Sequence, residues 1–165
     1  MSSPSPSASP VKPDVSGLIA AISRNKDDNT LARFLETHRW SVLADYMRPS
    51  VLPRGHLLIS QGALDRKLYF LESGSLKVDL RTDSGPMQLA ILGPGTVVGE
   101  GSFFSHLARS SSVAAYSPCK VWELGAPEFA ALSKQHPSAA LALSMALGAI
   151  LATRMLDMSK RVAVT

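Results

Sequence analysis

The positions of glycine and proline divide the 165-residue chain into three parts. Nine of its eleven glycines lie between Gly55 and Gly125, whereas no proline occurs from Asp14 to Arg48 or after Pro137. Glycine and proline interrupt helices and favour turns, so the middle must consist of short elements joined by turns, while both ends can be helical. The sequence therefore predicts helices on both sides of a turn-rich β domain.

Hydrophobic residues in the middle form short runs, in part alternating, which is typical of strands that bury one face. The expected strands are 56–60, 67–71, 75–80, 87–92, 96–98, 112–116 and 120–124, with a hairpin turn at 83–86. Helical spacing predicts helices over 15–24, 30–47 with Thr30 as the N-cap, 128–134 and 138–162. The fold class that follows is α+β: an antiparallel β-roll, or double-stranded jelly roll, flanked by N-terminal helices and a long C-terminal helix.

One domain accounts for most of the chain. We expect a disordered Ser/Pro tail over 1–14 and one domain over 15–165, divided into N-terminal helices (15–48), the β-roll (49–125) and C-terminal helices (127–163). Cys119 is the only cysteine, so no disulfide forms within the chain, and this favours the cytoplasm.

Two features of the sequence suggest other functions, nucleic-acid binding and a membrane span, but its details favour neither. The net charge of +4 suggests nucleic-acid binding, but the longest basic runs are pairs and the other cations are scattered, so no direct nucleic-acid contact is expected. Residues 135–153 carry no full charge, yet they include proline, hydroxyl residues and many alanines, which favours a packing helix over a membrane span. The N-terminus also lacks the apolar segment of a secretory signal.

Charged residues are almost absent from 84–119, where Glu100 and Arg109 are the only two. Glu100 follows an apolar run that ends at Gly99, and Arg109 precedes three serines. A guanidinium can hold a phosphate through two parallel hydrogen bonds, and a nearby carboxylate can accept hydrogen bonds from sugar hydroxyls. The pattern suits a compact anionic ligand with hydroxyl groups. From spacing alone, the alternative is a buried Glu100–Arg109 pair that only holds a loop in place.

The segment 97–113 resembles the phosphate-binding cassette of cyclic-nucleotide-binding domains. Its spacing from Gly99 to Arg109 agrees with that cassette without a gap. The resemblance covers about 35–162, and the order of helices, β-roll and long final helix is similar to the sensor half of catabolite-activator-type regulators. Upstream turns agree as well, at Gly62, Gly74 and Gly95.

The resemblance implies a role for each cassette residue. Glu100 would accept a hydrogen bond from the ribose 2′-hydroxyl, and Arg109 would pair with the cyclic phosphate. Backbone and small side-chain contacts to phosphate and sugar are implied at Gly99, Gly101, Ser102, Ser110 and Ser111. Two positions depart from the family pattern: Gly101 stands where an aliphatic residue is usual, and Ala108 replaces a common proline.

The resemblance also implies where the base is recognised. A hydroxyl after the arginine is associated with cyclic GMP, and Ser110 offers one, whereas hydroxyls on the long helix reach adenine in catabolite-activator-type proteins. The long helix offers Asp157, Met158 and Ser159 at about that place, although these residues could equally be solvated. Cyclic AMP is favoured slightly over cyclic GMP. His106, inside the cassette loop, is a further candidate for contact with the ligand.

The long helix carries a stripe of apolar residues at spacings of three and four: Leu143, Leu147, Leu151, Met155, Met158 and Val162. The resemblance implies that this helix forms a homodimer and closes over the nucleotide, while the alternative is that the stripe covers the β-roll of the same chain.

The sequence shows no helix-turn-helix, kinase motif, metal-ligand spacing or nucleophile–base pair. We therefore expect a non-catalytic sensor, without cofactor or metal, that moves its C-terminal helix to signal to a separate effector. The alternatives are an interaction module that binds no mononucleotide, a receptor for another messenger such as cyclic di-GMP, and a nucleic-acid-binding accessory.

Overall fold

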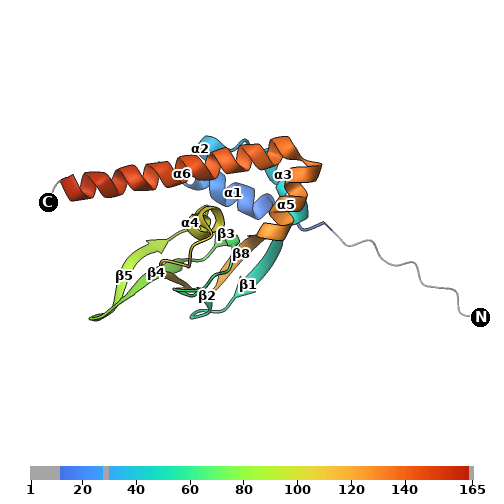
Figure 1. The fold of residues 1–165 in the computed structure, drawn as a ribbon. Coiled ribbons are helices and arrows are strands. Elements are labelled where there is room, and N and C mark those ends of the chain that lie inside the picture. The colour runs from blue at the N-terminus through green and yellow to red at the C-terminus, as the bar shows by residue number, and fades with distance from the viewer. Residues whose placement is uncertain (1–11, 28–29, 164–165) are drawn as a thin grey trace, which may run out of the picture.

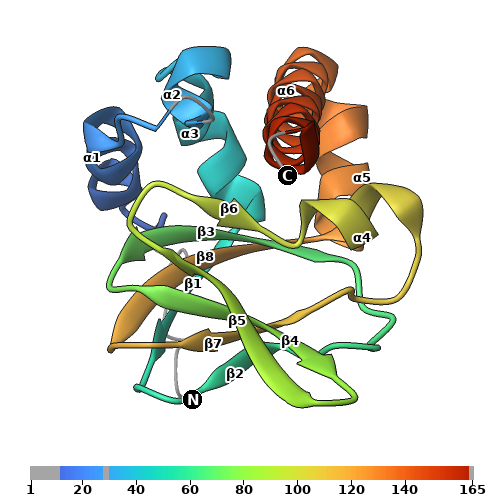
Figure 2. The same ribbon diagram turned by 90° about the vertical axis from the view of Figure 1, so that its left-hand side faces the viewer.

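The computed structural model describes residues 12–27 and 30–163, with side chains as far as residue 158. Three layers follow one another in Figure 2: helices above, one sheet in the middle and a second sheet below. The middle sheet has the strand order β1-β8-β3-β6 and the outer sheet β2-β7-β4-β5, and every strand pair is antiparallel. The predicted α+β fold with an antiparallel β-roll is confirmed.

The strands lie close to their predicted positions. A hairpin turn is present where one was expected, at 83–86, but it is shorter: residues 83–84 join β4 to β5, which pair from Thr82 and Gly85 onward. The eight strands are β1 (Arg48–Leu52), β2 (Leu57–Ile59), β3 (Lys67–Ser73), β4 (Leu76–Thr82), β5 (Gly85–Leu92), β6 (Val97–Val98), β7 (Ser112–Ala115) and β8 (Cys119–Gly125). No strand was expected at β1, which contains Pro49. Because β1 is the edge strand of its sheet, a residue without an N–H group is tolerated there.

The N-terminal helices differ more from expectation. Thr30 is the N-cap of α2, as predicted: its hydroxyl accepts a hydrogen bond from the Ala32 N–H at 3.4 Å. The single helix expected over 30–47 is wrong, because Leu35 is extended and buried, with 3% of its surface exposed. This part of the chain forms α1 (Ser16–Arg24), α2 (Leu31–Phe34), α3 (Arg39–Leu43) and a 3-10 turn η1 (Ala44–Tyr46).

The first residues of the predicted tail, 1–11, lie outside the described part of the chain, so its expected disorder stays a prediction. Residues 12–14 do make contacts: Lys12 pairs with Asp45 at 3.2 Å, and the Asp14 carboxylate accepts a hydrogen bond from the Ser16 N–H at 2.9 Å. That hydrogen bond lowers the pKa of Asp14 below its ordinary value.

Strand β3 separates the two hydrophobic cores. Leu68 and Phe70 face the helices, where they pack in a cluster with Trp40 and Leu143. Tyr69 and Leu71, which alternate with them along the strand, face the space between the two sheets. The middle sheet is therefore buried on both faces, which fixes the helices relative to the β-roll.

The chain ends in α5 (Ala126–Gln135) and the 27-residue helix α6 (Pro137–Ala163), whose last turns extend beyond the rest of the domain in Figure 1. The predicted apolar stripe on α6 divides along its length. Leu143 and Leu147 are fully buried in the domain, whereas Met155 and Met158 are 68% and 67% exposed. The side chain of Val162 lies outside the described residues.

A membrane span was not expected at α6. Over Pro137–Met158 the helix is long and apolar enough for one, with a mean hydropathy of 1.8, but 33% of it is buried inside the domain. Core helices of globular domains show the same properties, so this is weak evidence for a membrane.

Candidate functional site

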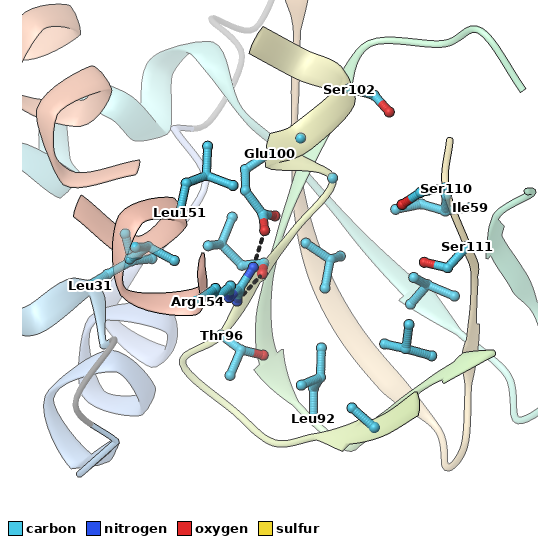
Figure 3. A pocket seen from close by; sticks show the side chains of 18 of the residues that line it. Leu31, Ile59, Leu92, Thr96, Glu100, Ser102, Ser110, Ser111, Leu151 and Arg154 are labelled. Carbon is cyan, nitrogen blue, oxygen red and sulfur yellow. Dashed lines mark hydrogen bonds and ion pairs between the residues drawn. The ribbon is translucent and has the colours of Figure 1, made fainter. Parts of the chain in front are cut away.

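A cavity of about 440 Å³ opens between the β-roll, the N-terminal segment and α6. The chain leaves β6, turns at Gly99 with a φ of 92°, and enters the short helix α4 (Glu100–Ser105). All seven predicted cassette residues line the cavity: Gly99, Glu100, Gly101, Ser102, Arg109, Ser110 and Ser111. Figure 3 shows Glu100 and the three serines around this space.

Arg109 is held by four hydrogen bonds, although its side chain is only 2% exposed. Nε and Nη2 donate to the two carboxylate oxygens of Asp65 at 3.2 and 2.7 Å, and Nη2 also donates to the Lys67 carbonyl at 2.8 Å. Nη1 donates to the Gly99 carbonyl at 3.0 Å. A guanidinium has five N–H groups, so these contacts leave one N–H of Nη1 for a ligand.

Asp65 is the partner of Arg109 that sequence reasoning missed. It lies 44 residues earlier, in the loop before β3, and only the folded chain brings the two together. Hydrogen bonding from Arg109 lowers the pKa of the Asp65 carboxyl below its usual range. The carboxylate therefore stays ionised and keeps the arginine oriented toward the cavity.

The left-handed glycine at the start of α4 makes this arrangement possible. A Cβ at Gly99 would lie 2.5 Å from the Lys67 carbonyl oxygen and 2.8 Å from Nη1 of Arg109. Gly101 is different, since it has no positive φ and a Cβ there would meet nothing within 4 Å. The departure from the family pattern at Gly101 thus leaves open space in the wall of the cavity.

The alternative to a ligand site was a buried Glu100–Arg109 pair that only holds a loop in place. The structure shows no such pair. The carboxylate of Glu100 is ion-paired with Arg154 of α6, and Nη2 of Arg154 donates to the Val97 carbonyl at 3.1 Å. Figure 3 shows the carboxylate of Glu100 directed at this guanidinium. Arg154 was missed as a site residue, although the sequence holds a signal: it is the first full charge after the uncharged stretch 135–153.

The rest of the cavity wall is mostly apolar. Side chains from the β-roll and α6 provide this surface: Ile59, Val78, Ala90, Leu92, Val98, Val113, Ile150 and Leu151. On the N-terminal side the wall continues with Asn25, Asp27 and Leu31, which were not expected at the site. A flat aromatic ring would fit the apolar surface, and an anionic group would fit the polar cassette.

The residues expected to contact the base lie elsewhere. Asp157 and Met158 are exposed on α6 and are not part of the cavity wall, and the side chain of Ser159 lies outside the described residues. His106 is exposed and ends α4 with a φ of 62°, also outside the wall. Among the described residues, no group of three or more His, Cys, Asp or Glu side chains is arranged to hold a metal ion.

Two curated relatives match part of the chain. "Glutaminase 2" of Bradyrhizobium diazoefficiens is 37% identical over 108 residues, which are 66% of this chain and 17% of that protein. "Cyclic AMP receptor protein" of Thermus thermophilus is 32% identical over 94 residues, 56% of this chain and 43% of that protein. The chain thus spans less than half the length of either relative.

A solved structure supports the fold, and a family model supports the family. The cyclic nucleotide-binding domain from Methylobacillus flagellatus superposes with a TM-score of 0.75 at 20% identity, over 90% of this chain and 82% of that one. The family model "Cyclic nucleotide-binding domain" matches residues 49–136, which include the whole β-roll and the cassette. Because that match takes in more than half of the sequence and all of the glycine, glutamate and arginine positions described above, the chain belongs to the cyclic nucleotide-binding domain family.

Proposed function

We propose that the protein is a non-catalytic sensor of a cyclic mononucleotide, with cyclic AMP preferred over cyclic GMP. The single observation that carries the proposal is the cavity, in which a buried carboxylate, Glu100, and a buried guanidinium, Arg109, lie between an apolar wall and a group of serines. The names of relatives such as the cyclic AMP receptor protein support the choice of cyclic AMP.

The cavity suggests how the nucleotide lies. The cyclic phosphate takes the remaining Nη1 hydrogen of Arg109 and the hydroxyls of Ser110 and Ser111, because these are the donors beside the arginine. The ribose 2′-hydroxyl donates to Glu100, and the base rests on the apolar surface of the β-roll. Glu100 is already paired with Arg154, so the sugar must share or take over a carboxylate that α6 uses.

This competition supplies a link between the ligand and the long helix. Arg154 belongs to α6, whereas Glu100 belongs to α4 beside the ligand. A ligand shifts a conformational equilibrium only if it binds the two states with different affinity. Contact between the ribose and Glu100 changes the energy of the Arg154–Glu100 pair, and it thereby favours one position of α6. A separate effector protein then reads that position.

The exposed face of α6 fits a homodimer. Leu141 and Met145 are 64% and 68% exposed, and the same face continues through Gly148, Ala152 and Met155. Successive positions on this face are separated by four and three residues in turn, which is the repeat of a coiled-coil seam. None of them carries a charge. Small residues at Gly148 and Ala152 let a second helix approach closely. We further propose that the dimer is cytoplasmic and makes no direct contact with nucleic acid.

Calorimetric titration of the full chain with cyclic AMP, cyclic GMP and cyclic di-GMP tests this function. We expect saturable binding of a cyclic mononucleotide at sub-millimolar concentration. Arg109→Lys keeps the charge but loses the planar geometry of the guanidinium, and we expect it to weaken binding about tenfold or more. Arg54→Ala, an exposed arginine outside the cavity, is the matched control.

Other outcomes separate the alternatives. Heat from cyclic di-GMP alone would identify the other messenger as the ligand. If the folded wild-type chain gives no heat with any of the three, the protein is an interaction module that retains the fold without the ligand. Binding that is equally strong in Arg109→Lys would contradict the cassette as the phosphate site.

A further inference from the structure

The loop that follows α1 forms one wall of the cavity. Asn25, Asp27 and Leu31 line the cavity although they lie about 70 residues before α4 in the sequence. Figure 3 shows Leu31 on the same side as Leu151 and Arg154, facing the apolar surface of the β-roll. The N-terminal segment is therefore part of the binding site as well as part of the helical layer.

This wall is attached firmly to the β-roll. The Asn25 side-chain amide donates to the Pro94 carbonyl at 3.2 Å, in the turn between β5 and β6. In the same turn Gly95 has a φ of 90°, and a Cβ there would lie 2.7 Å from the Ala21 carbonyl oxygen of α1. Only glycine permits so close an approach, so the end of α1 and the turn before β6 are in direct contact at the rim of the cavity.

The backbone of Asp27 is held on both sides. Its N–H donates to the side-chain oxygen of Asn25 at 2.9 Å, and its carbonyl accepts from the Thr30 N–H at 3.1 Å. Its carboxylate is exposed and forms no hydrogen bond or ion pair with any described residue. Glu100, the other acid in the wall, is occupied by Arg154. Because the proposed function also assigns Glu100 to the ribose, Asp27 is the acid of the cavity wall that remains, among the described residues, as an acceptor for the base.

The polar groups of the cavity fall into two sets with apolar residues between them. Arg109 and the serines form the set suited to the cyclic phosphate, while Asp27 belongs to the segment that leads to Leu31, and Figure 3 shows Leu31 on the other side of the cavity from Ser110 and Ser111. A nucleotide whose phosphate contacts Arg109 directs its base away from the cassette, across the apolar surface. A carboxylate at that end is an acceptor only, so it selects a base edge that donates.

We propose that Asp27 recognises the base, by accepting a hydrogen bond from an exocyclic amino group of a purine. This inference rests on the proposed function, and it places base recognition in the loop after α1 instead of on α6, where Asp157 and Met158 lie outside the cavity wall. Asn25 acts as a positioning residue, because it holds both the Asp27 N–H and the Pro94 carbonyl.

Two pairs of ligands that differ only in an amino group test the proposal. Cyclic AMP is compared with purine riboside 3′,5′-cyclic monophosphate, which lacks the amino group at C6. Cyclic GMP is compared with cyclic IMP, which lacks the amino group at C2. Each is titrated calorimetrically into wild type, Asp27→Ala, Asn25→Ala and the matched control Asp157→Ala, with thermal unfolding as the check that each variant is folded.

We expect wild type to bind the amino form of one pair about three- to tenfold more tightly. Asp27→Ala should lose that preference while its affinity for the analogue without the amino group stays unchanged, and Asn25→Ala should reduce the preference in part. Asp157→Ala should keep it. A preference that persists in Asp27→Ala, or its absence from both pairs in wild type, would overturn the proposal. If the proposal about Asp27 fails, wild type still binds the cyclic nucleotides. If the proposed function itself fails, wild type binds none of the four ligands.

Discussion

The guanidinium of Arg154 in α6 is paired with the carboxylate of Glu100 in α4, across 54 residues of sequence. The same guanidinium donates to the Val97 carbonyl at 3.1 Å, so it connects the long helix to both the helix and the strand that border the cavity. Glu100 is only 8% exposed, and a buried carboxylate is costly without a partner. The pair therefore connects α6, at Arg154, directly to the wall of the cavity.

A double-mutant cycle on this pair should show strong coupling. Removing one partner leaves the other charge buried, so Arg154→Met should lower the free energy of unfolding by about 1–3 kcal/mol. The double variant with Glu100→Gln should recover part of that loss, which gives a coupling energy of about 1–2 kcal/mol in urea unfolding. Lys134→Met, an exposed cation on α5, is the control. Additive effects of the two substitutions would contradict the pair.

The pairing of Asp65 with Arg109 should make stability depend on pH. Asp65→Asn should lower stability at pH 7 by about 1 kcal/mol, a small value because the acid is 39% exposed and solvent screens the pair. Since Arg109 lowers the folded-state pKa of Asp65, the carboxylate contributes stability above the unfolded-state pKa of about 3.9.

That contribution is lost as the pH falls through the folded-state pKa. The difference in melting temperature between wild type and Asp65→Asn should therefore shrink below about pH 4. Asp79→Asn is a suitable control, because the ion pair that Asp79 forms among the described residues is with Lys77 of its own strand, at 3.5 Å. A difference that stays constant from pH 7 to pH 3 would rule out the Asp65 carboxylate as its source.

The two glycines that flank Glu100 should respond in opposite ways to alanine. Gly101→Ala should raise stability by up to about 1 kcal/mol, because glycine is costly within a helix and the added Cβ meets nothing. Gly99→Ala should lower stability by at least about 1 kcal/mol, since its φ of 92° is unfavourable for alanine and its Cβ would touch Lys67 and Arg109. Thermal unfolding of the two variants compares them directly, and a loss in Gly101→Ala would be inconsistent with open space there.

The exposed seam on α6 should control the oligomeric state. Met145→Lys places a charge in the middle of the seam, so we expect the dimer to dissociate at least about tenfold more readily in sedimentation equilibrium. Leu64→Lys is the control, because Leu64 is also largely exposed, at 78%, but lies in the loop before β3 and not on α6. A monomeric wild type at high concentration would refute the dimer, and an unchanged dimer in Met145→Lys would refute this interface.

Local patterns predicted most of the fold. The hairpin between β4 and β5 and the cap at Thr30 followed from short-range turn and capping chemistry, and both are present, although the turn takes only residues 83–84 of the expected 83–86. The expected helix over 30–47 failed because burial of Leu35 in the helical core required an extended residue there. Strand β1 was missed because Pro49 is a poor strand residue in isolation, whereas pairing with β8 on one side only makes it acceptable.

The amino-acid sequence alone determined the turn-rich β domain and isolated Glu100 and Arg109, because glycine turns and scarce charges are local properties that need no partner to be visible. Tertiary structure decided what those two charges contact. Arg154 reaches Glu100 across 54 residues and Asp65 reaches Arg109 across 44, while the loop after α1 closes the cavity from the other end of the chain. Such contacts depend on how the two sheets and α6 pack, and packing is set by the whole buried core and not by any one segment.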